Sequence, residues 1–528
     1  MWERFCRGTR LCARTLAKYL ITVVACSAIL GAAVGAKASQ VDLADLLARY
    51  ERAMSDPQTG RLTRFEMAGT LVGAGSAGSF HIWHDGNNER LDQNLGLRRE
   101  RKIRTGERFF FVDESGFARE YHGVLLRHSR TEALIDSGEL AATAHCCKFL
   151  GSAHIAGRAA YELAVTAEGG DTEFLYLDAQ TALPLRLAYD EDDGQTTIDL
   201  SDWRTVNGRR FAFRNVASDG NHAFDLTQII ASVVVDAPID DALFIVPPSR
   251  SIEMHGIEHV ALIEHDGHFF VPVEIGGRTY RFLLDSGAQG ILLDRHVAGT
   301  LNLHEEGTFE ASGAQRTGGL RLAKLAVLRI GGATIRDSIV ATLDLGASSH
   351  GAFRIDGILG YPFFASAVVR VDFAGKMLSF GPPGSLASEG DYIDVDLDRG
   401  LSEAMLSADG VRAPFMIDTG NAADVLLYGP FVASHPGIVP TTLADMRSYG
   451  LGGSTDSYRS LLRELVLGTT TLRDVDVGVM LATQGAFADR FDAGNIGLGV
   501  LRKFIVTFDY PNEALFFEKS GNTSAMER

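Results

Sequence analysis

Cysteine is scarce in this sequence, with five residues among 528. Three of them, Cys6, Cys12 and Cys26, fall within the first 38 residues, so Cys146 and Cys147 alone remain for the rest of the chain. Two adjacent cysteines supply neither a disulfide framework nor the ligand spacing of a zinc site. We therefore expect no metal and no cofactor. The pair is open to two interpretations, a strained vicinal disulfide and two idle thiols.

Positive charge is also in short supply. The 50 Lys and Arg residues are outnumbered by 67 Asp and Glu residues, which gives a net charge of −17. A surface of this sign repels phosphate backbones, so the composition argues against nucleic acid as a partner. The hydrophobic fraction of 46% and the charged fraction of 22% are those of a globular protein, which argues against long disordered segments.

No segment after residue 38 is long and apolar enough to cross a bilayer, but the first 38 residues resemble an export signal. An apolar run from Tyr19 to Ala36 follows a basic stretch, and Ala36 and Ala38 place small side chains at the cleavage-determining positions. We predict a signal peptide at 1–38 and an exported protein, periplasmic or secreted. Two alternatives stay open, an uncleaved membrane anchor and lipidation of Cys26, which ends a lipobox-like sequence.

Residues 39–248 combine one helical pattern with a long β pattern. Leu43, Leu46, Leu47 and Tyr50 share one face at helical spacing. From about residue 61 to 235, strand-like runs are separated by turn pairs. These pairs are Gly169-Gly170, Asp193-Gly194 and Asn207-Gly208. A helix followed by a long antiparallel meander predicts a β half-barrel.

The stretch from Arg158 to Pro248 resembles the lipoprotein-carrier (LolA-like) superfamily. In that family the concave face of the sheet can hold acyl chains. The resemblance therefore implies a lipid or a lipoprotein as a candidate partner of residues 39–248. A spacer or a pro-domain with a filled core is the alternative.

Two breaks divide the sequence that follows. Pro247 and Pro248 cannot continue a sheet ladder, so residues 247–251 form a linker, and a second break lies at 381–384. The segments 256–383 and 391–520 repeat the same features in the same order. Two ancient copies of one β-rich lobe explain this better than chance.

Four features recur in each copy: a hairpin turn, an Asp-hydroxyl-Gly triplet, a glycine pair and an apolar segment that carries glycine. The hairpin turns are Gly276-Gly277 and Asp409-Gly410, and the triplets are Asp285-Ser286-Gly287 and Asp418-Thr419-Gly420. The glycine pairs are Gly318-Gly319 and Gly452-Gly453, and the apolar segments are 357–360 and 496–499. Three apolar residues precede each triplet and would hold its loop rigidly. The glycine lets the backbone turn tightly and leaves its amide available to the carboxylate.

This arrangement resembles the aspartic peptidases, the pepsin and retropepsin clan, over about residues 256–520. The resemblance implies a mostly β fold with two retropepsin-like acid-protease β-barrel lobes in tandem, preceded by the antiparallel half-barrel and its N-terminal helix. Because both lobes lie on one chain, the active dimer would be internal and the protein a monomer. Asp285 and Asp418 would form the catalytic dyad of an exported aspartic endopeptidase that hydrolyses peptide or protein substrates.

The resemblance also implies roles for the residues around the dyad. Ser286 and Thr419 would hydrogen-bond across the junction between the lobes. Two glycine-rich flaps would close over an extended peptide and exclude water. The supporting loop residues would be Ser286, Gly287, Thr419 and Gly420, and the flap residues Gly318, Gly319, Gly452 and Gly453. Asn421 departs from the small residue usual in the family, and Tyr449 is the only near candidate for a flap tyrosine.

Three other motifs invite functional interpretations. Asp136-Ser137-Gly138 is a third copy of the triplet, but it lacks the later features of the repeat, and residues 139–142 after it look helical. A GxGxxG match at 73–78 precedes a strand rather than the helix of a dinucleotide site, which predicts a loop. His255 and His259 match an HxxEH zinc-peptidase motif, but the sequence after them favours a strand.

The alternative to a peptidase is a non-catalytic periplasmic protein. The half-barrel would then hold lipid or a lipoprotein segment, and the lobes would serve only as a peptide-binding groove. A zinc peptidase that uses His255 and His259 is a third, weaker hypothesis.

Overall fold

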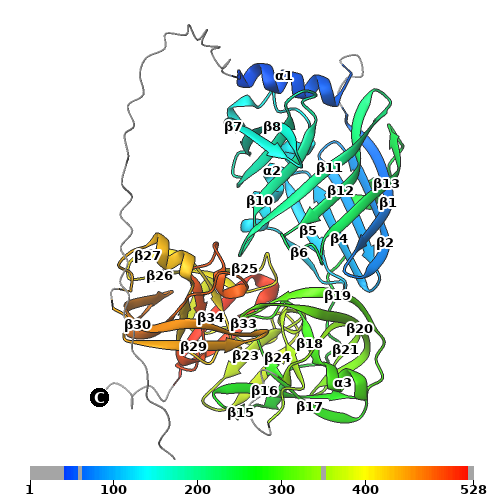
Figure 1. Ribbon diagram of the computed structural model, residues 1–528. Coiled ribbons are helices and arrows are strands. Elements are labelled where there is room, and N and C mark those ends of the chain that lie inside the picture. The colour runs from blue at the N-terminus through cyan, green and yellow to red at the C-terminus, as the bar shows by residue number, and fades with distance from the viewer. Residues whose placement is uncertain (1–40, 57–61, 347–352, 440, 521–528) are drawn as a thin grey trace, which may run out of the picture. The chain divides into compact units, whose positions relative to one another are not determined.

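The computed structural model describes residues 41–56, 62–346, 353–439 and 441–520 (Figure 1). The predicted signal peptide, including Cys26, lies outside the described residues. From residue 43 onward the chain forms one compact unit. No helix of the described ranges combines the length and the apolar character that crossing a membrane requires.

The N-terminal region begins with helix α1 (Leu43–Met54), which buries Leu46, Leu47 and Tyr50, as their helical spacing predicts. Thirteen strands of the described chain then form one antiparallel sheet in the order β6-β5-β4-β3-β2-β1-β13-β12-β11-β10-β9-β8-β7. The strands are β1 (Arg64–Gly73), β2 (Ser76–Asp85), β3 (Asn88–Leu95), β4 (Arg98–Thr105), β5 (Arg108–Val112), β6 (Ala118–Glu120), β7 (Cys147–Ile155), β8 (Arg158–Thr166), β9 (Thr172–Asp178), β10 (Pro184–Asp190), β11 (Gln195–Val206), β12 (Arg209–Ser218) and β13 (Leu226–Val235). The three turn pairs join β8 to β9, β10 to β11 and β11 to β12.

One helix of this region was misplaced by the sequence analysis. Helix α2 (Val124–Asp136) precedes the Asp136 triplet, whereas residues 139–142, expected to be helical, form turns. Apolar residues recur in both segments, so periodicity over four residues could not separate a helix from a turn. The GxGxxG motif is the β1–β2 hairpin, and a strand follows it as expected. Cys146 and Cys147 are free thiols, so the disulfide interpretation was wrong.

The second region contains two lobes with matching element order. Lobe 1 comprises β14 (Glu258–Ala261), β15 (Ile263–His265), β16 (His268–Ile275), β17 (Arg278–Leu284), β18 (Ile291–Asp294), α3 (Arg295–Thr300), β19 (Glu305–Ser312), β20 (Arg316–Ile330), β21 (Ala333–Leu343), β22 (Gly357–Leu359), α4 (Tyr361–Phe364), β23 (Val368–Asp372) and β24 (Met377–Gly381). Lobe 2 comprises β25 (Asp391–Asp396), β26 (Glu403–Ala408), β27 (Val411–Ile417), β28 (Val425–Leu427), α5 (Gly429–Ser434), β29 (Ala444–Gly450), β30 (Gly453–Leu467), β31 (Thr470–Met480), β32 (Gly494–Ile496), α6 (Leu498–Leu501), β33 (Phe504–Asp509) and β34 (Ala514–Lys519).

Strand pairing repeats from one lobe to the other. In lobe 1 the order β16-β17-β22-β18-β21-β20-β19 corresponds to β26-β27-β32-β28-β31-β30-β29 in lobe 2. The parallel pairs correspond as well, because β17 pairs with β22 as β27 pairs with β32. The expected fold class, mostly β with two tandem acid-protease lobes, is confirmed.

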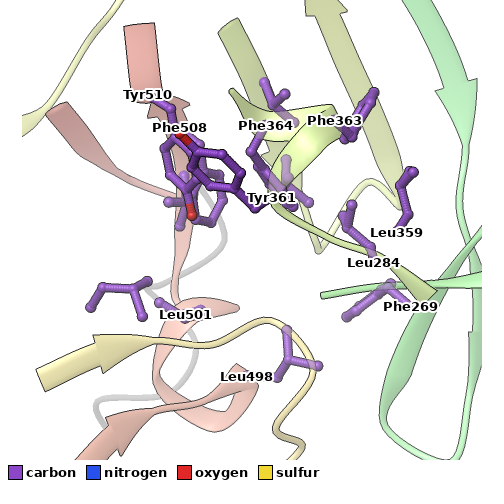
Figure 2. Close-up of a cluster of buried hydrophobic side chains, with 14 of the residues drawn as sticks. Phe269, Leu284, Leu359, Tyr361, Phe363, Phe364, Leu498, Leu501, Phe508 and Tyr510 are labelled. Carbon is purple, nitrogen blue, oxygen red and sulfur yellow. The ribbon is translucent and has the colours of Figure 1, made fainter. Parts of the chain in front are cut away.

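The lobes are joined by a shared sheet and a shared core. Strand β23 of lobe 1 pairs with β33 of lobe 2, and the sheet continues through β24 and β14 on one side and β34 and β25 on the other. Figure 2 shows Tyr361 and Phe364 of lobe 1 close to Phe508 and Tyr510 of lobe 2. The ring centroids of Phe364 and Phe508 are 5.0 Å apart. Burial of each such side chain contributes about 1.5–3 kcal/mol. The junction between the lobes is therefore part of the hydrophobic core.

Candidate active site

Each Asp-hydroxyl-Gly triplet lies directly after a buried central strand. Asp285 follows β17 and Asp418 follows β27. The backbone N–H of Asp285 donates to the carbonyl of Leu359 at 3.1 Å, and that of Asp418 donates to the carbonyl of Ile496 at 2.9 Å. Both aspartates are thus anchored to the strand beside their own, β22 in lobe 1 and β32 in lobe 2.

The hydroxyl residues of the two triplets brace one loop against the other. The backbone N–H of Ser286 donates to Oγ1 of Thr419, and the N–H of Thr419 donates to Oγ of Ser286, both at 3.0 Å. Each hydroxyl then donates to the backbone of the opposite strand, Ser286 to Ile417 at 2.6 Å and Thr419 to Leu284 at 2.8 Å. Because Ser286 and Thr419 are each only 1% exposed, this four-bond brace is shielded from competing water.

The two carboxyl groups meet above this brace. The N–H of Gly287 donates to Oδ1 of Asp285 at 2.9 Å, and the N–H of Gly420 donates to Oδ1 of Asp418 at 2.8 Å. Each glycine also lies against the other lobe's carboxyl group. A Cβ on Gly287 would be 2.8 Å from Cγ of Asp418, and a Cβ on Gly420 would be 2.5 Å from Cγ of Asp285. Only glycine leaves room for the carboxyl groups to face one another.

The surroundings raise the pKa of both carboxyl groups. Burial, followed by the nearby charge of Asp418, raises the pKa of Asp285 well above its usual range. Burial raises the pKa of Asp418 to about 6, against the hydrogen bonds from Gly420 and Asp285 that lower it. Two carboxyl groups this close, withdrawn from water, retain one shared proton at pH values where isolated aspartates have lost theirs.

Both lobes match a family model. Residues 271–363 and 404–499 match the model described as "Aspartyl protease", one match per triplet. The two lobes are aspartyl-protease-like. Among solved structures, the chain is similar to an aspartic proteinase from Irpex lacteus (13% identity, TM-score 0.34, 52% of this chain and 100% of that one). It is also similar to a LolA superfamily protein from Nitrosomonas europaea (12% identity, TM-score 0.29, 39% of this chain and 98% of that one). A search of curated proteins found no match.

Strand pairing within the two protease-like lobes changes which glycines of the two sequence copies correspond. Gly357 pairs with Phe282 and Gly494 pairs with Phe415, so Gly360 corresponds to Gly497. The order of the repeat in the sequence matches Gly360 with Gly499 instead, two residues too late. The error arose because Gly497 and Gly499 both follow an apolar residue, and only strand pairing distinguishes them.

The corrected register reveals an asymmetry that the sequence analysis missed. Asn495 of β32 occupies the position of Ile358 in β22. Its amide Nδ2 donates to Oδ2 of Asp418 at 2.9 Å, and Nδ2 of Asn421 donates to Oδ1 of Asn495 at 2.6 Å. Asn495 is a polar residue in the apolar segment of one copy only. This difference between the copies is the sequence signal that could have revealed the asymmetry.

Two hairpins of the protease-like lobes contain the predicted flap residues, and we call them the first and the second flap. The first is β19–β20, with its tip at Gly313, Ala314 and Gln315, and the second is β29–β30, with its tip at Leu451 and Gly452. Gly453 begins β30, and the predicted flap residues Gly318 and Gly319 lie inside β20 of the first hairpin, a few residues after its tip. The tips touch, because the N–H of Gln315 donates to the carbonyl of Leu451 at 3.4 Å.

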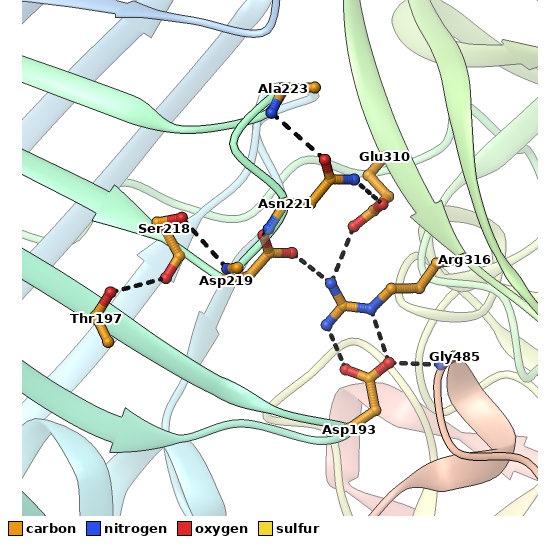
Figure 3. Close-up of polar contacts among 10 residues, drawn as sticks. Asp193, Thr197, Ser218, Asp219, Asn221, Ala223, Glu310, Arg316 and Gly485 are labelled. Atoms are coloured by element: carbon orange, nitrogen blue, oxygen red, sulfur yellow. Dashed lines mark hydrogen bonds and ion pairs between the residues drawn. The ribbon is translucent and has the colours of Figure 1, made fainter.

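The first flap is anchored to the N-terminal region by a cluster of charges. Figure 3 shows Arg316 of β20 surrounded by carboxylates, with Asp193 and Asp219 from the N-terminal region and Glu310 from β19. Asp193 also accepts a hydrogen bond from the N–H of Gly485 in lobe 2. The second flap has no comparable cover among the described residues, and its Tyr449 is 70% exposed.

A cavity of about 720 Å³ lies between the dyad and the flaps. Asp285 and Asp418 line it, together with apolar side chains such as Leu292, Met416 and Leu426. Four N-terminal residues, Arg98, Glu100, Glu114 and Asp192, also line it. The N-terminal region therefore contributes directly to the cleft above the dyad.

One wall of the cleft contains an ionic cluster around the buried Arg399. Arg399 pairs with Asp192, Glu403, Asp489 and Asp492 at 2.6–2.7 Å. Burial raises the pKa of Asp492 to about 7 and that of Asp192 to about 6. Since four carboxyl groups surround one guanidinium, these two retain protons into a pH range in which exposed aspartates are ionised.

The remaining motifs lie away from the dyad. Asp136 ends α2 and lines a separate cavity of about 500 Å³ in the N-terminal region. His255 and His259 are exposed, and β14 is a strand as expected. Within the described ranges, no three His, Cys, Asp or Glu side chains cluster closely enough to hold a metal ion.

Proposed function

We propose that the protein is an aspartic-type endopeptidase. The observation that carries the proposal is the pair of carboxyl groups, one from each lobe, that line one cleft together. Hydrogen bonds between Ser286 and Thr419 hold their two loops together, and two flaps cover the cleft. In this proposal Asp285 and Asp418 are the catalytic residues. Residues 39–248, 256–383 and 391–520 are the N-terminal domain and the two lobes of a monomer that functions outside the cytoplasm.

The reaction uses the shared proton of the pair. As the oxygen of a bound water bonds to the scissile carbonyl carbon, the ionised carboxylate takes a proton from that water. The protonated carboxyl group gives its proton to the carbonyl oxygen, so a neutral diol forms. The diol then returns one hydroxyl proton to the carboxylate that had protonated the carbonyl oxygen. The C–N bond breaks, and the departing nitrogen takes the proton that the other carboxyl group had received from water. Both carboxyl groups end in their starting states.

A cleft of this shape favours an extended peptide. The dyad lies below and the flap tips meet above, so a bound chain must pass between them. The apolar lining fits hydrophobic side chains of a substrate on either side of the scissile bond. Contact between the flap tips requires that at least one flap lifts to admit the peptide.

Digestion of a peptide library by the mature protein across pH tests this proposal. We expect Asp285→Asn and Asp418→Asn each to lower cleavage on the order of 10⁴-fold, because each removes one partner in proton transfer. Asp136→Asn is the matched control, since it alters the same short motif in the N-terminal domain. Cleavage that survives both single changes at the dyad, in folded protein, would refute the mechanism.

A second candidate function concerns the N-terminal domain alone. Its 500 Å³ cavity supports a binding role, and Lys102, Arg104, Glu132 and Asp136 are among the residues that line it. A charged lining disfavours a ligand made only of acyl chains. If the ligand is a lipid or a lipoprotein segment, we expect its polar part to contact these residues. Mass spectrometry of an organic extract of the purified protein would detect a retained lipid, and protein purified free of it would count against this role.

A further inference from the structure

The two halves of the dyad are not equivalent. Each aspartate accepts a backbone hydrogen bond at Oδ1 from the glycine two residues later. Oδ2 of Asp418 accepts a further hydrogen bond from Asn495. In lobe 1 the corresponding residue is Ile358, whose side chain has no N–H to offer.

The orientation of the Asn495 amide follows from its neighbours. The N–H of Ala423 donates to Oδ1 of Asn421 at 2.9 Å, so the Nδ2 group of Asn421 faces away from that backbone. This Nδ2 donates to Oδ1 of Asn495, which directs Nδ2 of Asn495 to Asp418. Because Asn495 is only 2% exposed, its amide has little access to water as an alternative partner.

These contacts determine which of the two aspartates holds the shared proton. Both oxygens of Asp418 accept hydrogen bonds from N–H groups, and these bonds are stronger when the carboxyl group is ionised. Among the described residues, Asp285 accepts an N–H at Oδ1 alone, which leaves its Oδ2 available to carry the proton. Hydrogen bonds from N–H groups stabilise the ionised form of a carboxyl group.

We propose that Asn495, held by Asn421, is a positioning residue that keeps Asp418 as the ionised base and leaves Asp285 as the proton donor. This inference rests on the proposed function, since it assigns the two roles of the peptidase mechanism.

Other ionisable groups near the dyad do not produce the asymmetry. Tyr428 and Tyr510 interact electrostatically with the aspartates, and burial raises the pKa of both hydroxyls, so they stay neutral. Arg399 is engaged by its four carboxylates, including Asp192 and Asp489. His268 also lines the cleft, and its Nδ1 contacts the backbone carbonyl of Asp266.

Labelling with a small aryloxymethyl epoxide tests the assignment without peptide cleavage. An ionised carboxylate oxygen attacks the epoxide carbon, the ring C–O bond breaks, and the alkoxide takes a proton from water. At pH 7, peptide mass spectrometry should find the ester on Asp418 of the wild-type protein. An ester on Asp285, or on neither residue, would overturn the inference.

Transferring the amide from lobe 2 to lobe 1 should transfer the ester from Asp418 to Asp285. Asn495→Leu replaces the amide with an apolar group of similar size, and we expect it to lower the preference for Asp418 about tenfold, equivalent to one pKa unit. In the double variant Ile358→Asn/Asn495→Leu the amide lies in lobe 1, and the ester should form on Asp285. A label that stays on Asp418 in the double variant would assign Asn495 a purely structural role.

Kinetics separate this inference from the proposed function. In Asn495→Leu, the acid limb of the kcat/KM profile should move up by about one pH unit, because Asp418 loses a hydrogen bond that favours its ionised form. The stability lost in this variant should grow as pH rises through about 6, where Asp418 ionises. Wild-type protein that is labelled on Asp418 but cleaves no peptide would refute the peptidase alone. Protein that cleaves peptides but is labelled on Asp285 would refute the assignment alone.

Discussion

At the scale of the residue, space around the dyad decides which substitutions are tolerated. A Cβ on Gly420 would lie 2.5 Å from Cγ of Asp285, closer than nonbonded carbons approach. We expect Gly420→Ala to displace that carboxyl group and to lower kcat/KM at least about 100-fold. Gly299→Ala is the control, because a Cβ there meets no atom within 4 Å. Equal activity of the two variants would show that the carboxyl groups are less closely placed.

The pH dependence of cleavage is also set by single residues. In the proposed mechanism, the active dyad has Asp418 ionised and Asp285 protonated. Because the pKa of Asp418 is raised to about 6 and that of Asp285 is raised well above its usual range, kcat/KM should rise as pH increases through about 6 and fall only when Asp285 loses its proton. A profile measured with a fluorogenic peptide tests this. A maximum below pH 4 would contradict it.

At the scale of the element, the two flaps differ in how firmly they are held. Arg316 fixes the first flap to the N-terminal domain, and it is only partly accessible among three carboxylates. Arg316→Met should leave those carboxylates unpaired, speed amide hydrogen exchange in β19 and β20, and raise KM several-fold. Exchange in β29 and β30 should not change, which provides an internal reference.

The matched control for this prediction lies on the same strand. Arg329 of β20 pairs with Glu274, and both side chains are about half exposed. Exposed ion pairs contribute little, so Arg329→Met should leave both exchange and KM close to those of the wild type. If Arg316→Met behaved like Arg329→Met, the charge cluster would not restrain the flap.

At the scale of the whole molecule, the N-terminal domain and lobe 1 share a small core. Leu95 of β3 packs in one cluster with Phe309 and Leu322 of the first flap. Leu95→Ala should therefore lower the free energy of unfolding by about 2–5 kcal/mol and also weaken substrate binding. Leu150→Ala, at a position that is 43% exposed, should change stability by less than about 0.5 kcal/mol. Chemical denaturation of the full chain measures both, and a Leu95→Ala protein as stable as Leu150→Ala would contradict this contact.

Much of the molecule was predictable from residue patterns of short range. The helix at Leu43, the hairpin turns and the two strand-triplet units depend on neighbours within one element, so their periodicity and glycine positions identify them. The predicted flap residues Gly318 and Gly319 lie inside β20, whereas the turn of that hairpin is at 313–315. The glycine pair does not locate the turn, because glycine pairs also occur inside strands. Nothing local distinguishes a glycine in a bent strand from one in a turn.

The sequence by itself determined that the chain contains two related β lobes and which aspartate each supplies, because a repeated motif survives in the order of residues. Only the tertiary structure decided how the lobes cooperate. Three contacts join residues that are far apart in the chain. They are the hydrogen bonds between Ser286 and Thr419, the hydrogen bond from Asn495 to Asp418, and the ion pair of Arg316 with Asp193 of the N-terminal domain. Such contacts depend on strand register and side-chain direction, and in a strand a shift of one residue reverses which face a side chain occupies.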